Sequence, residues 1–399
     1  MTEIQPVSDI LADEQMQAQC IFFDCYIQTF SMNYDEIHIP LSISICLFGA
    51  ASNVFNIIVL TRKRMRTPIN ILLTGLSFAQ WLLATNYFLF LLLEYYRMQC
   101  INVLWSEALT WYRFFNVNFN TVFHTIAFST TIVVAIFRYC ALKFPIQANR
   151  FIYKSKPAIV ANIIIWLIVP VISAPVFFIS EVRIVEDSPI IYHLNCTMPG
   201  PLYDLSYQAN PQLFSAVFWA FGVVFKILPS LILTILLIAL IRSLKSVERR
   251  RKNWKRTQGA QICTNSERKA KRKLTTRPRT TRMLVIILML CVLVELPNGF
   301  LNLCVAIYGE DFGNRVYDPM GNFMEMLTLL YSSVSFVLYC LMSNDFLTTF
   351  RVLFCPWSNK HQLSNIPGGS WRTRQEDTRS PRSCLMNGTA QSSFVGTYT

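Results

Sequence analysis

Seven long apolar stretches constrain the fold of this chain more than any other feature of its sequence. A helix that crosses a bilayer needs roughly 20 largely apolar residues, because about 30 Å of hydrocarbon must be covered at about 1.5 Å per residue. Of the 399 residues, 53% are hydrophobic and 15% are charged, which is too apolar for one soluble core. We therefore predict an all-α membrane protein, a seven-transmembrane helix bundle, with helices at about 39–61, 69–93, 109–140, 157–180, 212–242, 282–307 and 320–342.

The segments outside these helices divide the rest of the chain. We expect an extracellular amino terminus over residues 1–38, a basic cytoplasmic loop over 243–281 and a disordered cytoplasmic tail over 356–399. Apolar residues at helical spacing predict a short amphipathic eighth helix over 343–355 that lies on the membrane surface. The juxtamembrane Cys355 is a candidate for lipidation.

The distribution of basic residues predicts the orientation in the membrane. The net charge is +13, yet the first 61 residues contain no Lys or Arg, whereas a dense basic run from Arg249 to Arg256 separates the fifth and sixth helices. The positive-inside rule then places the amino terminus outside a multi-pass plasma-membrane protein. Because the basic residues follow this rule, we expect the lipid membrane, and no nucleic acid, as their partner.

Four cysteines fall on the predicted outer side, where disulfides form readily: Cys20, Cys25, Cys100 and Cys196. Four cysteines allow three pairings, and the sequence alone does not choose among them. We favour a disulfide between Cys100 and Cys196, which would tie the first outer loop to the second and leave the other two cysteines to close a small amino-terminal loop.

Few charged residues lie within the predicted helices, and charged groups at that depth usually face a cavity or a partner. Three glutamates give the predicted cavity a surplus of negative charge, which suits a cationic ligand such as a peptide that bears arginine. The third helix adds polar side chains at the centre of the bundle. The predicted ligand-binding residues are Glu325, Glu295, Glu94, Asn120, His124, Asn298 and Trp219.

A structural explanation competes with this functional one. Lys226 and Glu295 could neutralise each other, and the asparagines could hydrogen-bond between helices without contacting a ligand. Trp219 could anchor the fifth helix at the level of the lipid headgroups. Both explanations therefore stay open at the level of the sequence.

Patterns that carry catalysis or bind metal are absent from the sequence. It contains no glycine-rich phosphate loop, no paired Cys-x-x-Cys ligands and no His-Glu-x-x-His. Its four histidines are scattered along the chain. We therefore expect neither an enzyme, nor a metal site, nor a cofactor.

Several residues, each in the expected helix, together resemble rhodopsin-like (class A) G-protein-coupled receptors over roughly residues 39–355. They are Asn53, Phe137-Arg138-Tyr139, Trp166, Pro229 and Pro297. The resemblance implies that a heterotrimeric G protein docks at Arg138, Tyr139 and Tyr339, with hinges at Pro229 and Pro297. It also implies that arrestin and a receptor kinase act on the tail.

A narrower resemblance follows from Thr67-Pro68-Ile69-Asn70 and Glu295-Leu296-Pro297, which look like the corresponding motifs of invertebrate myosuppressin and FMRFamide-type neuropeptide receptors. It implies an amidated neuropeptide ligand that ends in Arg-Phe-amide. We expect the ligand's guanidinium to pair with Glu325, our first choice, or with Glu295. The alternatives are a serpentine chemoreceptor for small molecules and, less favoured, an ion transporter or channel.

The sequence departs from the wider receptor pattern at several positions. Phe137 replaces the usual acid before Arg138, which suggests higher basal activity. Glu295 occupies the position of a common tryptophan. Arg113 stands where most of the family has the disulfide cysteine, which is a further reason to expect Cys100 as the partner of Cys196.

Overall fold

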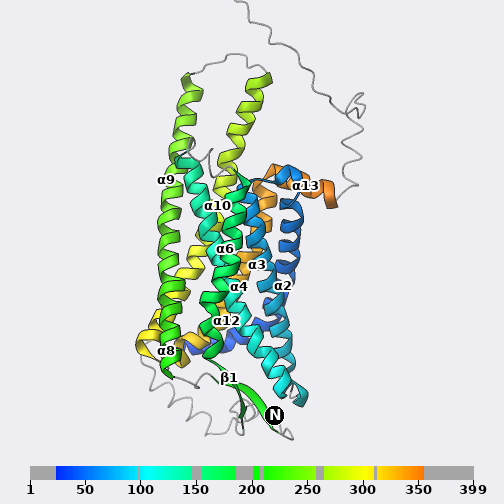
Figure 1. Cartoon of the computed structure of the whole chain (residues 1–399), viewed down its shortest axis with the longest axis vertical. Coiled ribbons are helices and arrows are strands. Elements are labelled where there is room, and N and C mark those ends of the chain that lie inside the picture. Colours follow the sequence, from blue (N-terminus) through cyan, green and yellow to red (C-terminus); the bar gives the residue numbers. More distant parts are fainter. Residues whose placement is uncertain are drawn as a thin grey trace, which may run out of the picture. The chain divides into compact units, whose positions relative to one another are not determined.

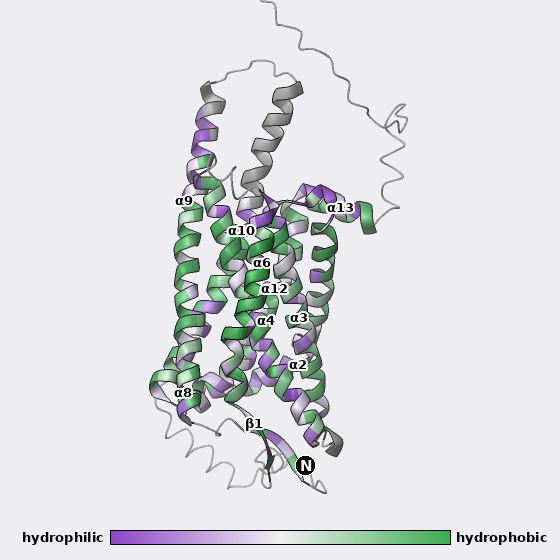
Figure 2. Ribbon diagram, in the orientation of Figure 1, coloured by the Kyte–Doolittle hydropathy of each residue, from purple (hydrophilic) through white to green (hydrophobic). Residues whose placement is uncertain are grey.

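The structure is a computed structural model that describes residues 24–97, 99, 101–144, 154–185, 201–206, 211–257, 265–309 and 312–354. Within these residues, seven helical segments are long and apolar enough to cross a membrane. Figure 1 shows them side by side as one bundle, and Figure 2 shows that apolar residues predominate along their length. The predicted fold class, an all-α bundle of seven helices with a short eighth helix, is confirmed.

The spans consist of the following elements. They are α2 (Asp24–Leu60), α3 (Pro68–Arg97), α4 (Glu107–Lys143), α6 (Ser155–Ser173) with η3 (Ala174–Phe178), α8 (Pro211–Ala220) with η4 (Phe221–Ile227) and α9 (Leu228–Thr257), α10 (Asn265–Tyr308), and η5 (Gly313–Tyr317) with α12 (Asp318–Met342). The eighth helix is α13 (Asn344–Phe354), and the short elements η1 (Lys63–Met65) and η2 (Asn102–Trp105) connect the first spans.

A hairpin marks one end of the bundle. Strand β1 (Glu181–Val185) pairs antiparallel with β2 (Leu202–Ser206), with Glu181 opposite Ser206 and Val185 opposite Leu202. Figure 1 shows the hairpin at the end opposite α13. We call these the hairpin end and the α13 end. Because α4 begins at the hairpin end, residues of α4 with higher numbers lie deeper in the bundle.

The first helix begins earlier than the apolar pattern indicates. It starts at Asp24 rather than near residue 39, and it continues through Pro40. Its added turns are stabilised by polar contacts: His38 Nδ1 lies 3.0 Å from the Tyr34 hydroxyl, and His38 Nε2 lies 3.3 Å from the hydroxyl of Tyr87 on α3. Buried polar groups that are paired in this way can continue a helix beyond its apolar stretch.

The segment expected as a basic loop over 243–281 is helical over most of its length. Helix α9 continues to Thr257, and α10 begins at Asn265. Arg and Lys have high helix propensity, so the charged run can extend both helices beyond the apolar spans. Figure 1 shows these two extensions reaching past the other helices at the α13 end.

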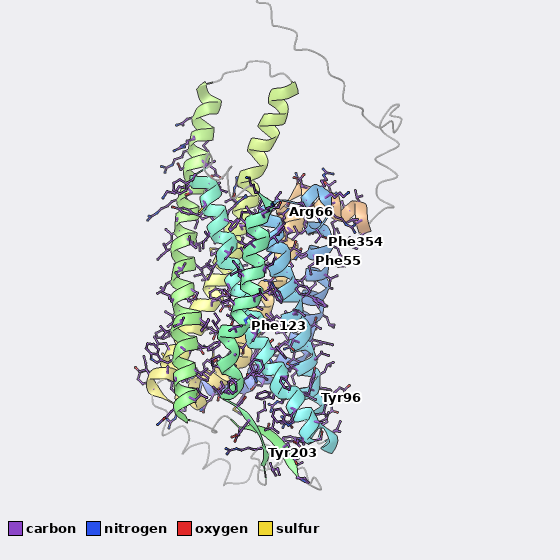
Figure 3. The ribbon with its side chains drawn as sticks, viewed as in Figure 1. Phe55, Arg66, Tyr96, Phe123, Tyr203 and Phe354 are labelled. Atoms are coloured by element: carbon purple, nitrogen blue, oxygen red, sulfur yellow. The ribbon has the colours of Figure 1, made fainter. Side chains whose placement is uncertain are left out.

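Polar side chains buried between helices join the spans to one another. Asn53 Nδ2 donates to the Gly49 carbonyl at 3.0 Å within α2, and Asn56 Nδ2 donates to Ser335 Oγ on α12 at 3.3 Å. Helix α13 packs on α2 through the rings of Phe55 and Phe354, whose centroids lie 5.0 Å apart and which Figure 3 labels. Packing and interhelical hydrogen bonds therefore act together, as expected in a bilayer.

We expect Gly75→Ala to destabilise the packing of α3 on α6. A Cβ at Gly75 would lie 2.5 Å from Asn162 Oδ1, and Asn162 Nδ2 already donates to the Ile71 carbonyl at 3.0 Å. The amide cannot turn away without losing this bond, so the free energy of unfolding should fall by about 1–2 kcal/mol. The midpoint of thermal unfolding in detergent measures the effect.

Gly321→Ala is the matched control, because no atom lies within 4 Å of a Cβ built at Gly321. Alanine favours a helix over glycine, so this variant should unfold at the same temperature as the wild type or higher. Equal losses in both variants would contradict the packing argument.

Candidate functional site

A polar cavity lies between α4, η3, α8, η4, α10 and α12. Its empty volume, including its open mouth, is about 1060 Å³. Four predicted binding residues line it: Asn120, His124, Asn298 and Glu325. The cavity therefore brings together residues from three spans that are far apart in the sequence.

Two polar pairs on α4 form the wall and floor of this cavity. Asn120 Nδ2 donates to Glu325 Oε1 on α12 at 2.9 Å. His124 follows Asn120 by four residues, so it lies about 6 Å deeper along the helix axis. Its Nε2 lies 2.9 Å from Glu295 Oε1 on α10. Helix α4 therefore holds one carboxylate at the cavity wall and a second one about a turn below it.

Glu295 lies behind His124 and is not part of the accessible surface of the site. Its side chain is 0% exposed, and Tyr331 donates a second hydrogen bond to Oε1 at 3.4 Å. Its other oxygen, Oε2, is buried and has no hydrogen-bond partner among the described residues. The described ion pairs of Glu295 include His124 but not Lys226, so the mutual neutralisation of Lys226 and Glu295 considered from the sequence does not occur as a direct contact.

One side of the cavity is apolar. Val176, Ile179 and Val217 are buried together, with the rings of Phe218 and Phe221 packed against them, and all five line the cavity. On the α10 side, Asn298 Oδ1 accepts a hydrogen bond from Asn302 Nδ2 at 3.0 Å. The cavity thus offers an anionic group, amide groups and an aromatic wall within one site.

Two predicted binding residues lie elsewhere. Trp219 is 53% exposed and is not part of the cavity lining, which fits the lipid-anchor interpretation better. Glu94 belongs to a group of four charged residues at the hairpin end. We call Glu94, Arg97, Arg113 and Asp204 the outer ionic cluster.

The outer ionic cluster joins α3, α4 and β2. Arg113 lies 2.6 Å from both Glu94 Oε1 and Asp204 Oδ1, and Arg97 lies 3.0 Å from Asp204 Oδ1. The Arg97 guanidinium also lies 3.8 Å from the ring centre of Trp105. Sequence reasoning missed Arg97 and Asp204, because only the folded hairpin brings β2 to the ends of α3 and α4.

The hairpin is held by backbone contacts as well. Thr110 Oγ1 donates to the Tyr203 carbonyl at 3.0 Å, and Arg97 Nη2 donates to the same carbonyl at 3.5 Å. Figure 3 labels Tyr203 on the hairpin. The cluster and these bonds together fix β2 on the ends of α3 and α4, at the end of the bundle where α4 begins.

We expect Asp204→Asn to destabilise the fold by about 2 kcal/mol or more. The change leaves Arg97 and Arg113, whose side chains are 4% and 20% exposed, without the carboxylate that they share. The midpoint of thermal unfolding in detergent measures the loss.

The control is Glu181→Gln on the neighbouring strand, where Glu181 pairs with Arg183 and the two side chains are 40% and 53% exposed. An exposed ion pair contributes about 0–1 kcal/mol, so this variant should unfold close to the wild-type temperature. If Asp204→Asn lowers the unfolding temperature no more than the control does, the cluster does not hold the hairpin.

The residues predicted to act at the other end lie on α4 and α12. Arg138 donates to Thr281 Oγ1 on α10 from Nε at 3.0 Å and from Nη2 at 2.6 Å. Lys143 Nζ lies 5.3 Å from the Tyr139 ring. Tyr339 is buried, and its ring stacks on Phe346 of α13 at 5.1 Å. Arg138 thus joins α4 to α10 at the α13 end.

The two predicted hinge prolines lie beside the cavity. Pro229 is the second residue of α9, which follows the π-helical segment η4, and Pro297 lies in α10 between Glu295 and Asn298. The predicted disulfide of Cys100 with Cys196 and the lipidation site Cys355 fall outside the described residues. Within the part of the chain that the structure describes, no group of three or more His, Cys, Asp or Glu residues could hold a metal ion.

Comparison with known proteins gives a family match and several relatives. The model of the family described as "Serpentine type 7TM GPCR chemoreceptor Srw" matches residues 40–356. The chain is 25% identical over 375 residues to the G-protein coupled receptor dmsr-1 of Caenorhabditis elegans. The aligned region covers 84% of this chain and 71% of that protein.

Two further relatives are named as receptors or as related to one. The chain is 28% identical over 338 residues to the sex peptide receptor-related protein 2 of C. elegans, over 79% of this chain and 71% of that protein. It is 24% identical over 334 residues to the thyrotropin-releasing hormone receptor of Gallus gallus, over 80% of this chain and 79% of that protein.

Proposed function

The chain belongs to the serpentine 7TM GPCR chemoreceptor family Srw and is a G-protein-coupled receptor, and we propose that its ligand is an amidated neuropeptide. In this proposal the peptide ends in Arg-Phe-amide, as in FMRFamide-like and myosuppressin-like peptides, and the chain is a rhodopsin-like receptor rather than an enzyme. The amino terminus and the hairpin end face the outside of the plasma membrane, and the α13 end faces the cytoplasm.

The observation that carries this proposal is the half-buried carboxylate of Glu325 on the cavity wall. It accepts one hydrogen bond from the neutral Asn120, and no Lys, Arg or His pairs with it among the described residues. Glu295, the other candidate, is fully buried and bound by His124 and Tyr331. A guanidinium can form two parallel hydrogen bonds with a carboxylate, so Glu325 is the better partner for a ligand arginine.

The shape and chemistry of the cavity support the same ligand. The apolar wall of Val176, Ile179, Val217, Phe218 and Phe221 can pack a phenylalanine ring next to the polar side of the site. Two of the relatives add to this support, since one is named as related to a sex peptide receptor and the other as a thyrotropin-releasing hormone receptor.

Ligand binding would shift an equilibrium between two arrangements of α10. Pro297 lies inside α10, where it removes a backbone donor and provides a bending point. A bend there would move the α13 end of α10 away from Arg138 and open the surface for the G protein. We further propose that a receptor kinase and arrestin act on the tail beyond residue 355.

We expect Glu325→Gln to weaken the response to Arg-Phe-amide peptides about tenfold or more, because the charge-assisted pair with the ligand arginine is lost. The measurement is G-protein activation in transfected cells, with a panel of synthetic peptides and with surface expression checked by antibody labelling. Trp219→Phe is the matched control, since Trp219 lies outside the cavity. Equal potency on Glu325→Gln and wild type would contradict the assignment.

We expect Thr281→Val to raise the basal signal of the receptor. The substitution keeps the shape of the buried side chain but removes the oxygen that accepts two hydrogen bonds from Arg138. Loss of a hydrogen bond to a charged group costs about 1.5–3 kcal/mol, which would favour separation of α4 and α10. Second-messenger levels without ligand, compared at equal surface expression, measure the effect, and a basal signal equal to wild type would count against it.

A receptor for small molecules is the second candidate, and the family description as a chemoreceptor favours it. The peptide panel separates the two candidates. Silence of a receptor that reaches the cell surface, against every Arg-Phe-amide peptide, would support the small-molecule alternative.

A further inference from the structure

Lys226 is a charged cavity residue for which the proposed function gives no role. It lies on η4, within the candidate span Ala216–Arg250, and its side chain lines the cavity. Among the described residues, the ion pairs do not include Lys226. A cation at this depth that faces a cavity without a counter-ion in contact is costly, and such residues usually mark binding sites.

The local backbone explains why Lys226 reaches the cavity. The π-helical winding of η4 changes the direction of its side chains relative to an α-helix, and such segments often lie at functional sites. Two glycines let η4 lie close to α10: a Cβ at Gly299 would be 3.2 Å from Lys226 Cβ, and one at Gly222 would be 3.3 Å from Asn302 Cβ. Lys226 therefore enters the site from the η4 wall, beside the turn that carries Asn298.

The charges around the cavity decide which ligand group can face Lys226. Glu325 and Lys226 line the cavity, and Glu295 lies below it within electrostatic range of Lys226. His124 Nε2 holds Glu295 by a contact of 2.9 Å to its Oε1. The three charges then sum to one negative charge, which a ligand with a single cation balances. A ligand that also carries a carboxylate would leave the site with one net negative charge again, and a buried net charge is costly.

We propose that Lys226 is a second ligand-anchoring residue, which donates a hydrogen bond to the carbonyl oxygen of the ligand's terminal carboxamide. This inference rests on the proposed function and deepens it. Glu325 on α12 holds the guanidinium, and Lys226 on η4 holds the amide end, so the ligand spans the cavity in one direction. The site prefers a neutral amide to a free acid because the amide supplies the acceptor without the additional negative charge.

The test compares three synthetic peptides of the same sequence on the full-length receptor. They end in Arg-Phe-amide, in Arg-Phe with a free carboxylate, and in an Arg-phenethylamide that lacks the terminal carboxamide. Each peptide is titrated on the wild type, on Lys226→Met, on Lys226→Arg and on Glu325→Gln, at matched surface expression, with G-protein activation as the readout.

We expect Lys226→Met to lower the potency of the amide about ten- to a hundredfold, the range for a lost hydrogen bond to a charged group. On the wild type, the phenethylamide should be less potent than the amide. Its potency should be the same on Lys226→Met as on the wild type, because it lacks the group that contacts Lys226. Lys226→Arg should retain most of the amide response. Glu325→Gln should weaken both peptides, since both contain the arginine.

The outcomes separate the two proposals. Equal losses of the amide and the phenethylamide on Lys226→Met would show that Lys226 acts on the fold and would overturn the inference. The inference also fails if Lys226→Met changes nothing, and in that case a loss on Glu325→Gln leaves the proposed function standing. A free acid that is more potent than the amide on the wild type overturns the inference and the amidated ligand of the proposed function together. Silence of the wild type towards all three peptides overturns the proposed function and, with it, this inference.

Discussion

The two hydrogen bonds that α4 makes to carboxylates of neighbouring spans are the interactions on which the rest of the site depends. A carboxylate within a membrane span is costly unless it is hydrogen-bonded, because hydrocarbon offers it no solvation. Asn120 and His124, one turn apart, bind Glu325 of α12 and Glu295 of α10. They therefore hold three spans at a defined separation, and the cavity is the space that remains between them.

The two ends of the bundle are joined in different ways, and the difference matches their roles in the proposed mechanism. At the hairpin end, the outer ionic cluster joins α3, α4 and β2 by several ion pairs that share Asp204. At the α13 end, Arg138 contacts α10 through the neutral hydroxyl of Thr281. In the proposed mechanism, separation of α10 from α4 breaks these hydrogen bonds, whereas the outer ionic cluster stays intact.

The sequence predicted the helices well wherever apolar length alone decides them. It placed the start of α2 too late and predicted a loop where α9 and α10 continue, because hydropathy measures the membrane span and not the helix. It selected polar residues in the spans because such groups tend to face inward, and four of them line one cavity: Asn120, His124, Asn298 and Glu325. It could not separate these residues from Glu94 and Trp219, which have similar chemistry but lie outside the cavity.

The amino-acid sequence by itself determined that the chain is a bundle of seven membrane helices with a few ionisable residues inside, because bilayer thickness and the cost of buried charge act on local segments. Only the tertiary structure decided which of those charges meet. Arg113 finds Asp204 on a hairpin that the apolar pattern does not reveal, His124 rather than Lys226 contacts Glu295, and Lys226 enters the cavity where two glycines let η4 lie against α10. These contacts join residues distant in sequence, and hydropathy carries no information about such pairs.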